Sequence, residues 1–156
     1  MANTTDTANV IIRPPIAWAI AVLAGLALNR LMPFPFVPSA VPAGWAGAMI
    51  FALALAMLVW AIATIARSGS NVPTNRPTTT IVETGPYRFT RNPIYLSMML
   101  GLIGLGIAFD SLWLLLTLVP FALVIRYGVI AREEAYLERK FGDVYGRYRA
   151  RVRRWL

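Results

Sequence analysis

Long apolar stretches alternate along this chain with short polar or proline-rich ones. Residues 11–32 are apolar except for Arg13, Asn29 and Arg30, and residues 43–66 carry no charge. A helix that rises 1.5 Å per residue crosses the hydrocarbon layer of a bilayer in about 20 residues. Both stretches are therefore predicted to be transmembrane helices.

Two further apolar stretches, residues 93–109 and 112–131, are separated only by Asp110-Ser111. This spacing predicts a tight hairpin of two more transmembrane helices, the first of them short. The stretch 33–38 contains three prolines, each of which removes a backbone donor and opposes helix formation, so we expect a loop there. The polar stretch 68–92 is longer than most loops in compact domains, which is typical of a functional or a disordered segment.

The C-terminal segment is highly charged, yet apolar residues recur in it every three or four positions. That spacing predicts an amphipathic helix lying on the membrane surface, interrupted near Gly142. After Gly146 a plain membrane anchor is the favoured interpretation. The apolar positions are Leu137, Phe141, Val144 or Tyr145, Tyr148, Val152 and Trp155.

Together these elements predict an all-α integral membrane protein with about four transmembrane helices and a C-terminal amphipathic interfacial helix. We expect one domain, residues 1–156, made of two spans (1–66), a loop (67–92), a helical hairpin (93–131) and the C-terminal segment (132–156). With four spans, 14 of the 15 basic residues lie on one side and Arg30 alone on the other. The positive-inside rule then predicts cytoplasmic N- and C-termini, as in a prokaryotic inner membrane.

The amino-acid composition limits the kinds of site and partner that the chain can have. Hydrophobic residues make up 58% and charged residues only 14%, whereas soluble domains average about 25% charged residues. The absence of cysteine and histidine removes thiolate ligands, the commonest metal ligand and the usual general base, so we expect no metal site. The net charge of +8 comes without any nucleic-acid-binding motif, which favours anionic membrane lipids over nucleic acid as the partner.

A first candidate site lies between Gly85 and Tyr95. Gly85-Pro86 predicts a turn, and Asn92-Pro93 predicts a helix start with an Asn92 side-chain cap. A helix N-terminus with Arg88 and Arg91 beside it suits a carboxylate or phosphate. A simple cap with arginines reaching the membrane interface explains the same residues equally well.

Two more clusters follow. Gly101, Gly104 and Gly106 favour close helix packing, although a flat ligand could use the same groove. Arg126, Tyr127, Arg132, Glu133 and Glu134 end the fourth predicted helix, where charged residues are ordinary. All three clusters lie on one side of the membrane, however, and together they indicate a pocket open to lipid. Such a pocket suits a cofactor that carries a carboxylate and sugar hydroxyls.

These residues resemble a known superfamily over roughly residues 65–155. The runs Gly85-Pro86-Tyr87-Arg88 and Arg91-Asn92-Pro93-Ile94-Tyr95, the glycine-bearing helix and Glu133-Glu134 are similar to the isoprenylcysteine carboxyl methyltransferases and phospholipid N-methyltransferases. The resemblance implies a membrane methyltransferase that uses S-adenosyl-L-methionine without a soluble Rossmann-type fold. The cofactor-binding residues that it implies are Tyr87, Arg91, Asn92, Pro93, Tyr95, Gly101, Gly104, Glu133 and Glu134.

One position departs from the family. Asn92 stands where many members have histidine, so it is expected to contact ligand but not to act as a base. We hypothesise that Arg91 meets the cofactor carboxylate, that Glu133 and Glu134 bind its polar or cationic groups, and that Arg126 and Glu134 are the catalytic pair. In this scheme Arg126 orients an anionic acceptor.

The acceptor stays open at the level of sequence. An isoprenylcysteine-type carboxylate, the amine of phosphatidylethanolamine and a small lipophilic molecule all fit a membrane methyltransferase. A non-catalytic lipid-binding scaffold held by the basic tail is the alternative of a different class.

Overall fold

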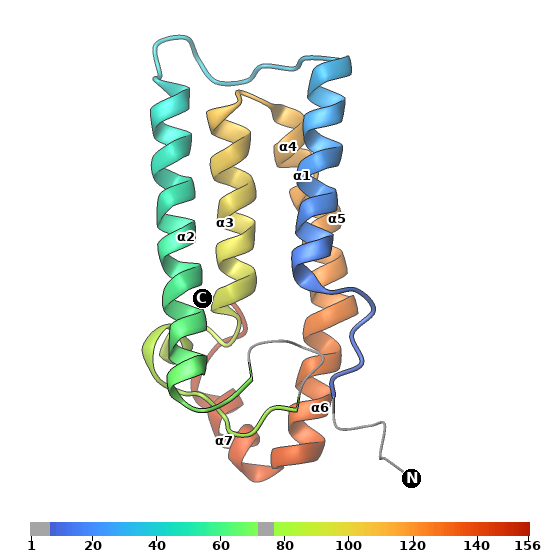
Figure 1. The fold of residues 1–156 in the computed structure, drawn as a ribbon, viewed down its shortest axis with the longest axis vertical. Helices are drawn as coiled ribbons and strands as arrows, with labels where there is room; N and C mark the ends of the chain where they lie inside the picture. The colour runs from blue at the N-terminus through green and yellow to red at the C-terminus, as the bar shows by residue number, and fades with distance from the viewer. Residues whose placement is uncertain (1–6, 72–76) are drawn as a thin grey trace.

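The computed structural model describes residues 7–71 and 77–156, and within these ranges every regular element is helical. Figure 1 shows α1, α2, α3 and the helical stretch that begins at α4 running side by side as rods, with the short helices α6 and α7 gathered at one end. The elements are α1 (Pro14–Leu31), α2 (Ala43–Arg67), η1 (Gly85–Arg88), α3 (Pro93–Ala108), α4 (Leu112–Leu116), α5 (Leu118–Leu123), η2 (Val124–Ile130), α6 (Ala131–Phe141) and α7 (Asp143–Arg151).

The all-helical fold predicted from the apolar pattern is confirmed. Three helical stretches, Pro14–Leu31, Ala43–Arg67 and Leu112–Phe141, are long and apolar enough to cross a membrane. Helix α3, with 16 residues, is the short third helix that the sequence predicts. The bundle thus has three helical stretches of spanning length and one shorter apolar helix, which is roughly compatible with the four predicted spans.

The fourth rod is longer than the predicted stretch 112–131, because it continues through α6 into the charged segment. It is also irregular. Pro120 lacks a backbone donor and its ring clashes with the preceding turn, which accounts for the interruption at Thr117 between α4 and α5. The π-helical turn η2 follows, and the rod ends at Gly142, whose φ of +48° matches the predicted break.

Helices α2 and α3 approach each other so closely that two glycines are required at the contact. A Cβ added to Gly104 would lie 2.7 Å from the Phe51 nitrogen and 3.0 Å from the Gly47 carbonyl oxygen. A Cβ added to Gly47 would overlap the backbone of Ala108. The close contact fixes α3, whose N-terminus borders the candidate site described below, against α2.

The opposite end of the bundle is tied together by Asp110. This residue has a positive φ of +44° in the turn between α3 and α4, and its carboxylate accepts from the backbone N–H groups of Phe36 and Val37 at 2.8 and 2.7 Å. The proline-rich loop after α1 is thereby joined to the hairpin, which explains why an acidic residue stands in an otherwise apolar turn.

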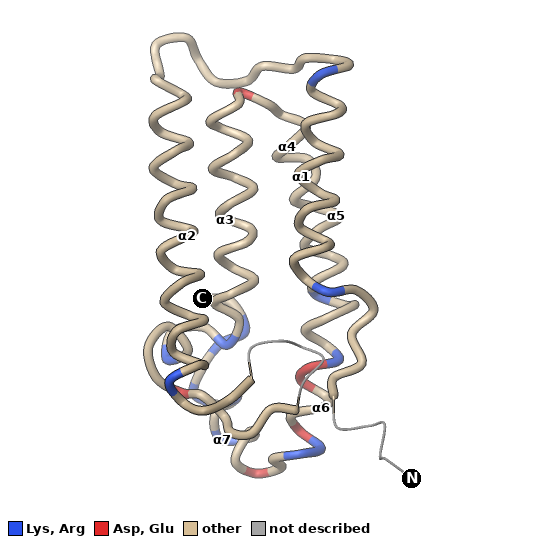
Figure 2. Tube along the Cα trace, in the orientation of Figure 1, with Lys and Arg blue, Asp and Glu red and all other residues tan. Residues whose placement is uncertain are grey.

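Charge is concentrated at the end where α6 and α7 lie (Figure 2). Among the described residues, Arg30 and Asp110 are the charged ones at the other end. Arg76, which the sequence assigns to the basic side, lies outside the described residues. The separation agrees with the predicted positive-inside topology, and the side of the membrane itself stays a prediction.

Two expectations need correction. Asn92 occupies the N-cap position of α3, but its side chain makes no capping bond, because its Nδ2 donates to the backbone oxygen of Arg154. The C-terminal helix does not continue to Trp155. It ends at Arg151, and residues 152–156 turn back toward the start of α3.

The α2–α3 contact yields a stability prediction. Gly47→Ala should lower the free energy of unfolding by about 1–3 kcal/mol, because the added methyl group meets backbone that cannot move aside. Thermal unfolding in detergent measures the loss. Gly44→Ala is the matched control, since a Cβ there has no neighbour within 4 Å. Equal midpoints for the two variants would contradict the close contact.

Candidate functional site

A pocket opens at the charged end of the bundle, between the N-terminus of α3, helices α6 and α7, and the loop after α2. The pocket and its open mouth together hold about 860 Å³ of space. The loop contributes a polar and aliphatic wall consisting of Ser70, Asn71, Thr78, Thr80, Ile81 and Val82. The loop 68–84 thus covers part of the pocket, apart from residues 72–76, which are outside the described ranges.

Tyrosines dominate the rest of the lining. Tyr87, Tyr95, Tyr136, Tyr145 and Tyr148 all face the pocket and are all nearly buried. Burial raises the pKa of Tyr87, Tyr145 and Tyr148, so these phenols stay protonated at neutral pH and serve as hydrogen-bond donors. The Tyr148 hydroxyl donates to the Tyr87 backbone oxygen at 2.8 Å, which joins α7 to η1.

Glu133 is the carboxylate of the pocket. Its two oxygens lie 2.8 and 2.9 Å from the Tyr95 hydroxyl, which donates to them. Within residues 7–71 and 77–156, no arginine or lysine forms an ion pair with Glu133. A partly buried carboxyl group with a single neutral donor retains acceptor capacity that a ligand can use.

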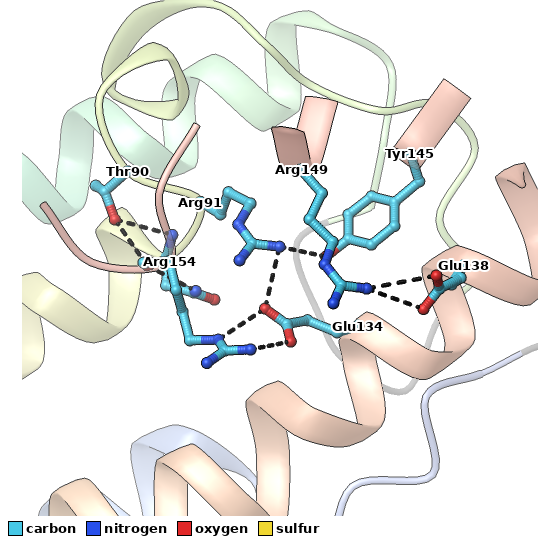
Figure 3. A network of polar contacts seen from close by, with 8 residues as sticks. Thr90, Arg91, Glu134, Glu138, Tyr145, Arg149 and Arg154 are labelled. Carbon is cyan, nitrogen blue, oxygen red and sulfur yellow. Dashed lines mark hydrogen bonds and ion pairs between the residues drawn. The ribbon is translucent and has the colours of Figure 1, made fainter. Parts of the chain in front are cut away.

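Glu134, the next residue, points into an ionic network instead (Figure 3). Arg154 forms a fork on it, with Nε 3.0 Å from Oε1 and Nη2 2.8 Å from Oε2. Arg91 approaches the same carboxylate with Nη1 3.2 Å from Oε1, and that nitrogen also donates to the Tyr145 hydroxyl at 3.2 Å. Glu134 therefore neutralises one of two neighbouring arginines.

The chain end, residues 152–156, completes this corner and is called the C-terminal strap below. Its backbone accepts three hydrogen bonds from the segment before α3: Arg91 N to Arg153 O at 3.0 Å, Asn92 Nδ2 to Arg154 O at 3.0 Å, and Thr90 Oγ1 to Arg154 O at 3.1 Å. Trp155 packs against the buried core of the bundle. The strap is thus attached through both its backbone and its side chains.

Six of the predicted site residues line the pocket together, namely Tyr87, Arg91, Asn92, Pro93, Tyr95 and Glu133. These six residues come from the segment before α3, from α3 itself and from α6, and they surround one pocket. Asn92 and Glu134 do not bond to each other across it, because Arg154 bridges them with its carbonyl on one and its guanidinium on the other.

The other predicted site residues lie outside the pocket. Gly104 is at the α2–α3 contact, and a Cβ added to Gly101 would lie 3.6 Å from the Trp18 ring and 3.8 Å from the Phe51 ring, so both glycines take part in helix packing. Arg126, in η2, is half-buried with its guanidinium 5.2 Å from the centre of the Tyr127 ring. A ligand role for these residues and for Glu134 stays a prediction.

Two residues of the site, Tyr136 and Arg154, are not predicted from the sequence. Tyr136 follows Glu133 by three positions, so helical spacing places both on one face and could have identified it. Arg154 gives no such signal. It is one of several arginines in a charged tail, and only the reversal of the strap brings it to Glu134.

The site's polar groups complement a ligand that carries both an anion and hydrogen-bond donors. Arg91 is 9% exposed, and its Nε is buried without a hydrogen-bond partner among the described residues. Glu133 lies in the lining of the same pocket and forms no ion pair with any described arginine or lysine. Among the residues the structure describes, no three His, Cys, Asp or Glu side chains gather as metal ligands would.

Comparison with known proteins gives two findings. A family model described as phospholipid methyltransferase matches residues 42–144, which include α2, η1, α3 and both glutamates. A protein of Haemophilus influenzae (strain ATCC 51907 / DSM 11121 / KW20 / Rd), named only as uncharacterized, is 48% identical over 63 residues, which are 40% of this chain and 100% of that protein. Residues 42–144, which the family model matches, contain every predicted site residue.

The bond between α7 and η1 can be tested directly. Tyr148→Phe should lower the free energy of unfolding by about 1–3 kcal/mol, because it leaves the Tyr87 carbonyl without its donor in a buried position. The control is Tyr127→Phe, which removes a phenol hydroxyl from a residue that is 65% exposed. Thermal unfolding of both variants in detergent gives the comparison, and a Tyr148 variant no weaker than its control would refute the assignment.

Proposed function

Because this chain belongs to the phospholipid methyltransferase family, we propose that it transfers a methyl group from S-adenosyl-L-methionine to a lipid acceptor at the charged end of its bundle. One observation supports the proposal above all. A nearly buried arginine and a carboxyl group that forms no ion pair within the described residues line the same tyrosine-rich pocket, at one end of an apolar helical bundle. A non-catalytic lipid scaffold would not need these two groups in one pocket.

The residues fit the methyl donor group by group. Arg91, whose Nε has no hydrogen-bond partner among residues 7–71 and 77–156, suits the carboxylate of the amino-acid part. Glu133 suits the ribose hydroxyls or the ammonium group, both of which donate hydrogen bonds. The faces of the pocket tyrosines attract a sulfonium cation through their π electrons. Asn92 and the α3 N-terminus, started by Pro93, add neutral contacts on the same wall.

When bound, S-adenosyl-L-methionine would supply a methyl group to a nucleophile, with the sulfonium sulfur leaving as a neutral thioether. The chain's task is then to hold acceptor and donor in line and to keep water out. Loop residues 78–82 and helix α7 enclose the pocket on the side away from the bundle. Tyr87 and Tyr148 bond to each other across η1 and α7, which keeps this wall rigid.

We place the acceptor on the membrane side of the pocket. Arg126 is a half-buried cation in the part of the fourth rod nearer the bilayer, where it suits the phosphate of a phospholipid or the carboxylate of an isoprenylcysteine. The family favours the phospholipid, with its amine as methyl acceptor. In this arrangement Arg126 binds the acceptor, Glu134 holds Arg91, and both chain termini are cytoplasmic.

Membranes containing the protein should transfer label from methyl-labelled S-adenosyl-L-methionine into the lipid fraction, because the acceptor reaches the pocket from the bilayer. Separating lipid, protein and soluble fractions after incubation measures the transfer. Membranes with an Arg91→Gln protein are the control and should show little labelling. Label in the protein fraction would favour a prenylated protein as acceptor, and an unlabelled sample would reject the proposed activity.

Glu133→Gln should weaken binding of S-adenosylhomocysteine on the order of tenfold, because the amide accepts fewer hydrogen bonds than the carboxyl group. Titration calorimetry of purified protein measures the affinity. Glu138→Gln is the matched control, since Glu138 is an exposed glutamate on the same helix that pairs with Arg149. Equal affinities for the two variants would remove Glu133 from the cofactor site.

A further inference from the structure

The C-terminal strap has a feature that the methyl-transfer scheme above leaves unused. Its Arg154 makes a two-pronged contact with Glu134, which is also the ion-pair partner of Arg91. The family match ends at residue 144, so the strap lies beyond the region that the comparison covers. Arg154 comes to the site only because the chain reverses after α7 and bonds to residues 90–92.

The geometry shows how Glu134 is divided between its two partners. Arg154 engages both carboxylate oxygens and so fixes the plane of the group, whereas Arg91 reaches only Oε1 through a single nitrogen. Arg91 therefore remains incompletely neutralised, and its buried Nε has no hydrogen-bond partner in the part of the chain that the structure describes. Two guanidinium groups share one carboxylate, which leaves one positive charge in excess among these three groups.

Without Arg154, the ion pairs of Glu134 would change. Glu134 would lose its fork and be free to turn toward Arg91, forming the closed, neutral pair that arginine and carboxylate prefer. Arg91 would then offer less charge and fewer free donors to a ligand. From this geometry we propose that Arg154 is a positioning residue, which holds Glu134 away from full pairing and so keeps Arg91 available for the carboxylate of the cofactor.

This proposal rests on the proposed function, and two ligands separate the two ideas. S-adenosylhomocysteine carries the amino-acid carboxylate, while 5′-methylthioadenosine has the same nucleoside and sulfur without it. Arg154→Gln should weaken S-adenosylhomocysteine binding on the order of tenfold and change 5′-methylthioadenosine binding less than about twofold, since only the former meets Arg91. A merely structural loss would weaken both ligands alike.

Arg153→Gln is the matched control. It removes the same charge from the adjacent, exposed position, where only the backbone oxygen is used. Arg154→Lys keeps the charge but cannot form the fork, so it should show a smaller, still selective loss and serves as the test if Arg154→Gln does not fold. In a Glu134→Gln background the effect of Arg154→Gln should disappear, because the residue acts through Glu134.

Calorimetric titration of the full-length protein in detergent with each ligand decides the matter. An Arg154 variant that binds both ligands as the Arg153 variant does, or loses both equally, would overturn the positioning role and leave the methyltransferase proposal intact. Wild-type protein that binds neither ligand would overturn both.

Discussion

Charged groups at the end of a membrane bundle must be paired, because an isolated ion in a poorly solvated site costs several kcal/mol. This constraint organises the site. Glu134 has Arg91 on one side and Arg154 on the other, and these two arginines belong to segments 63 residues apart in the chain. Removing the carboxylate would leave two like charges facing each other. The C-terminal strap, α6 and the start of α3 are therefore bound to one another through this carboxylate.

Two neighbouring glutamates consequently have different surroundings. Glu133 turns to Tyr95 and the pocket, while Glu134 turns to the arginines. Adjacent carboxylates repel each other, and the helix resolves the conflict by directing them to separate faces about 100° apart. The resulting division leaves one acidic group available to a ligand and uses the other to position a basic one. A site for a molecule that bears both charges needs both arrangements.

The apolar part of the fold serves the same site from a distance. Gly47 and Gly104 allow α2 and α3 to touch along their backbones, and Asp110 joins the loops at the opposite end. These contacts hold the short α3 in place, so that its first residues, Asn92 and Pro93, stand at the pocket wall. The glycines that the resemblance assigned to cofactor binding thus contribute here through helix packing, which the bare sequence also favoured.

The sequence by itself determined the helices, their approximate bounds, the concentration of charge at one end and six pocket residues, because these depend on local composition, helical spacing and a compact motif. Proline at 93 and glycine at 142 act on their own backbone, so their effects could be read directly. Only the tertiary structure decided the destination of the Asn92 amide, the division of labour between Glu133 and Glu134, and the place of Arg154. The Asn92 and Arg154 contacts depend on a chain reversal that brings residues 90–92 against residues 153–154, and the Glu133 contact depends on the packing of α6 against α3. Contacts between such distant segments leave no periodic trace in the sequence.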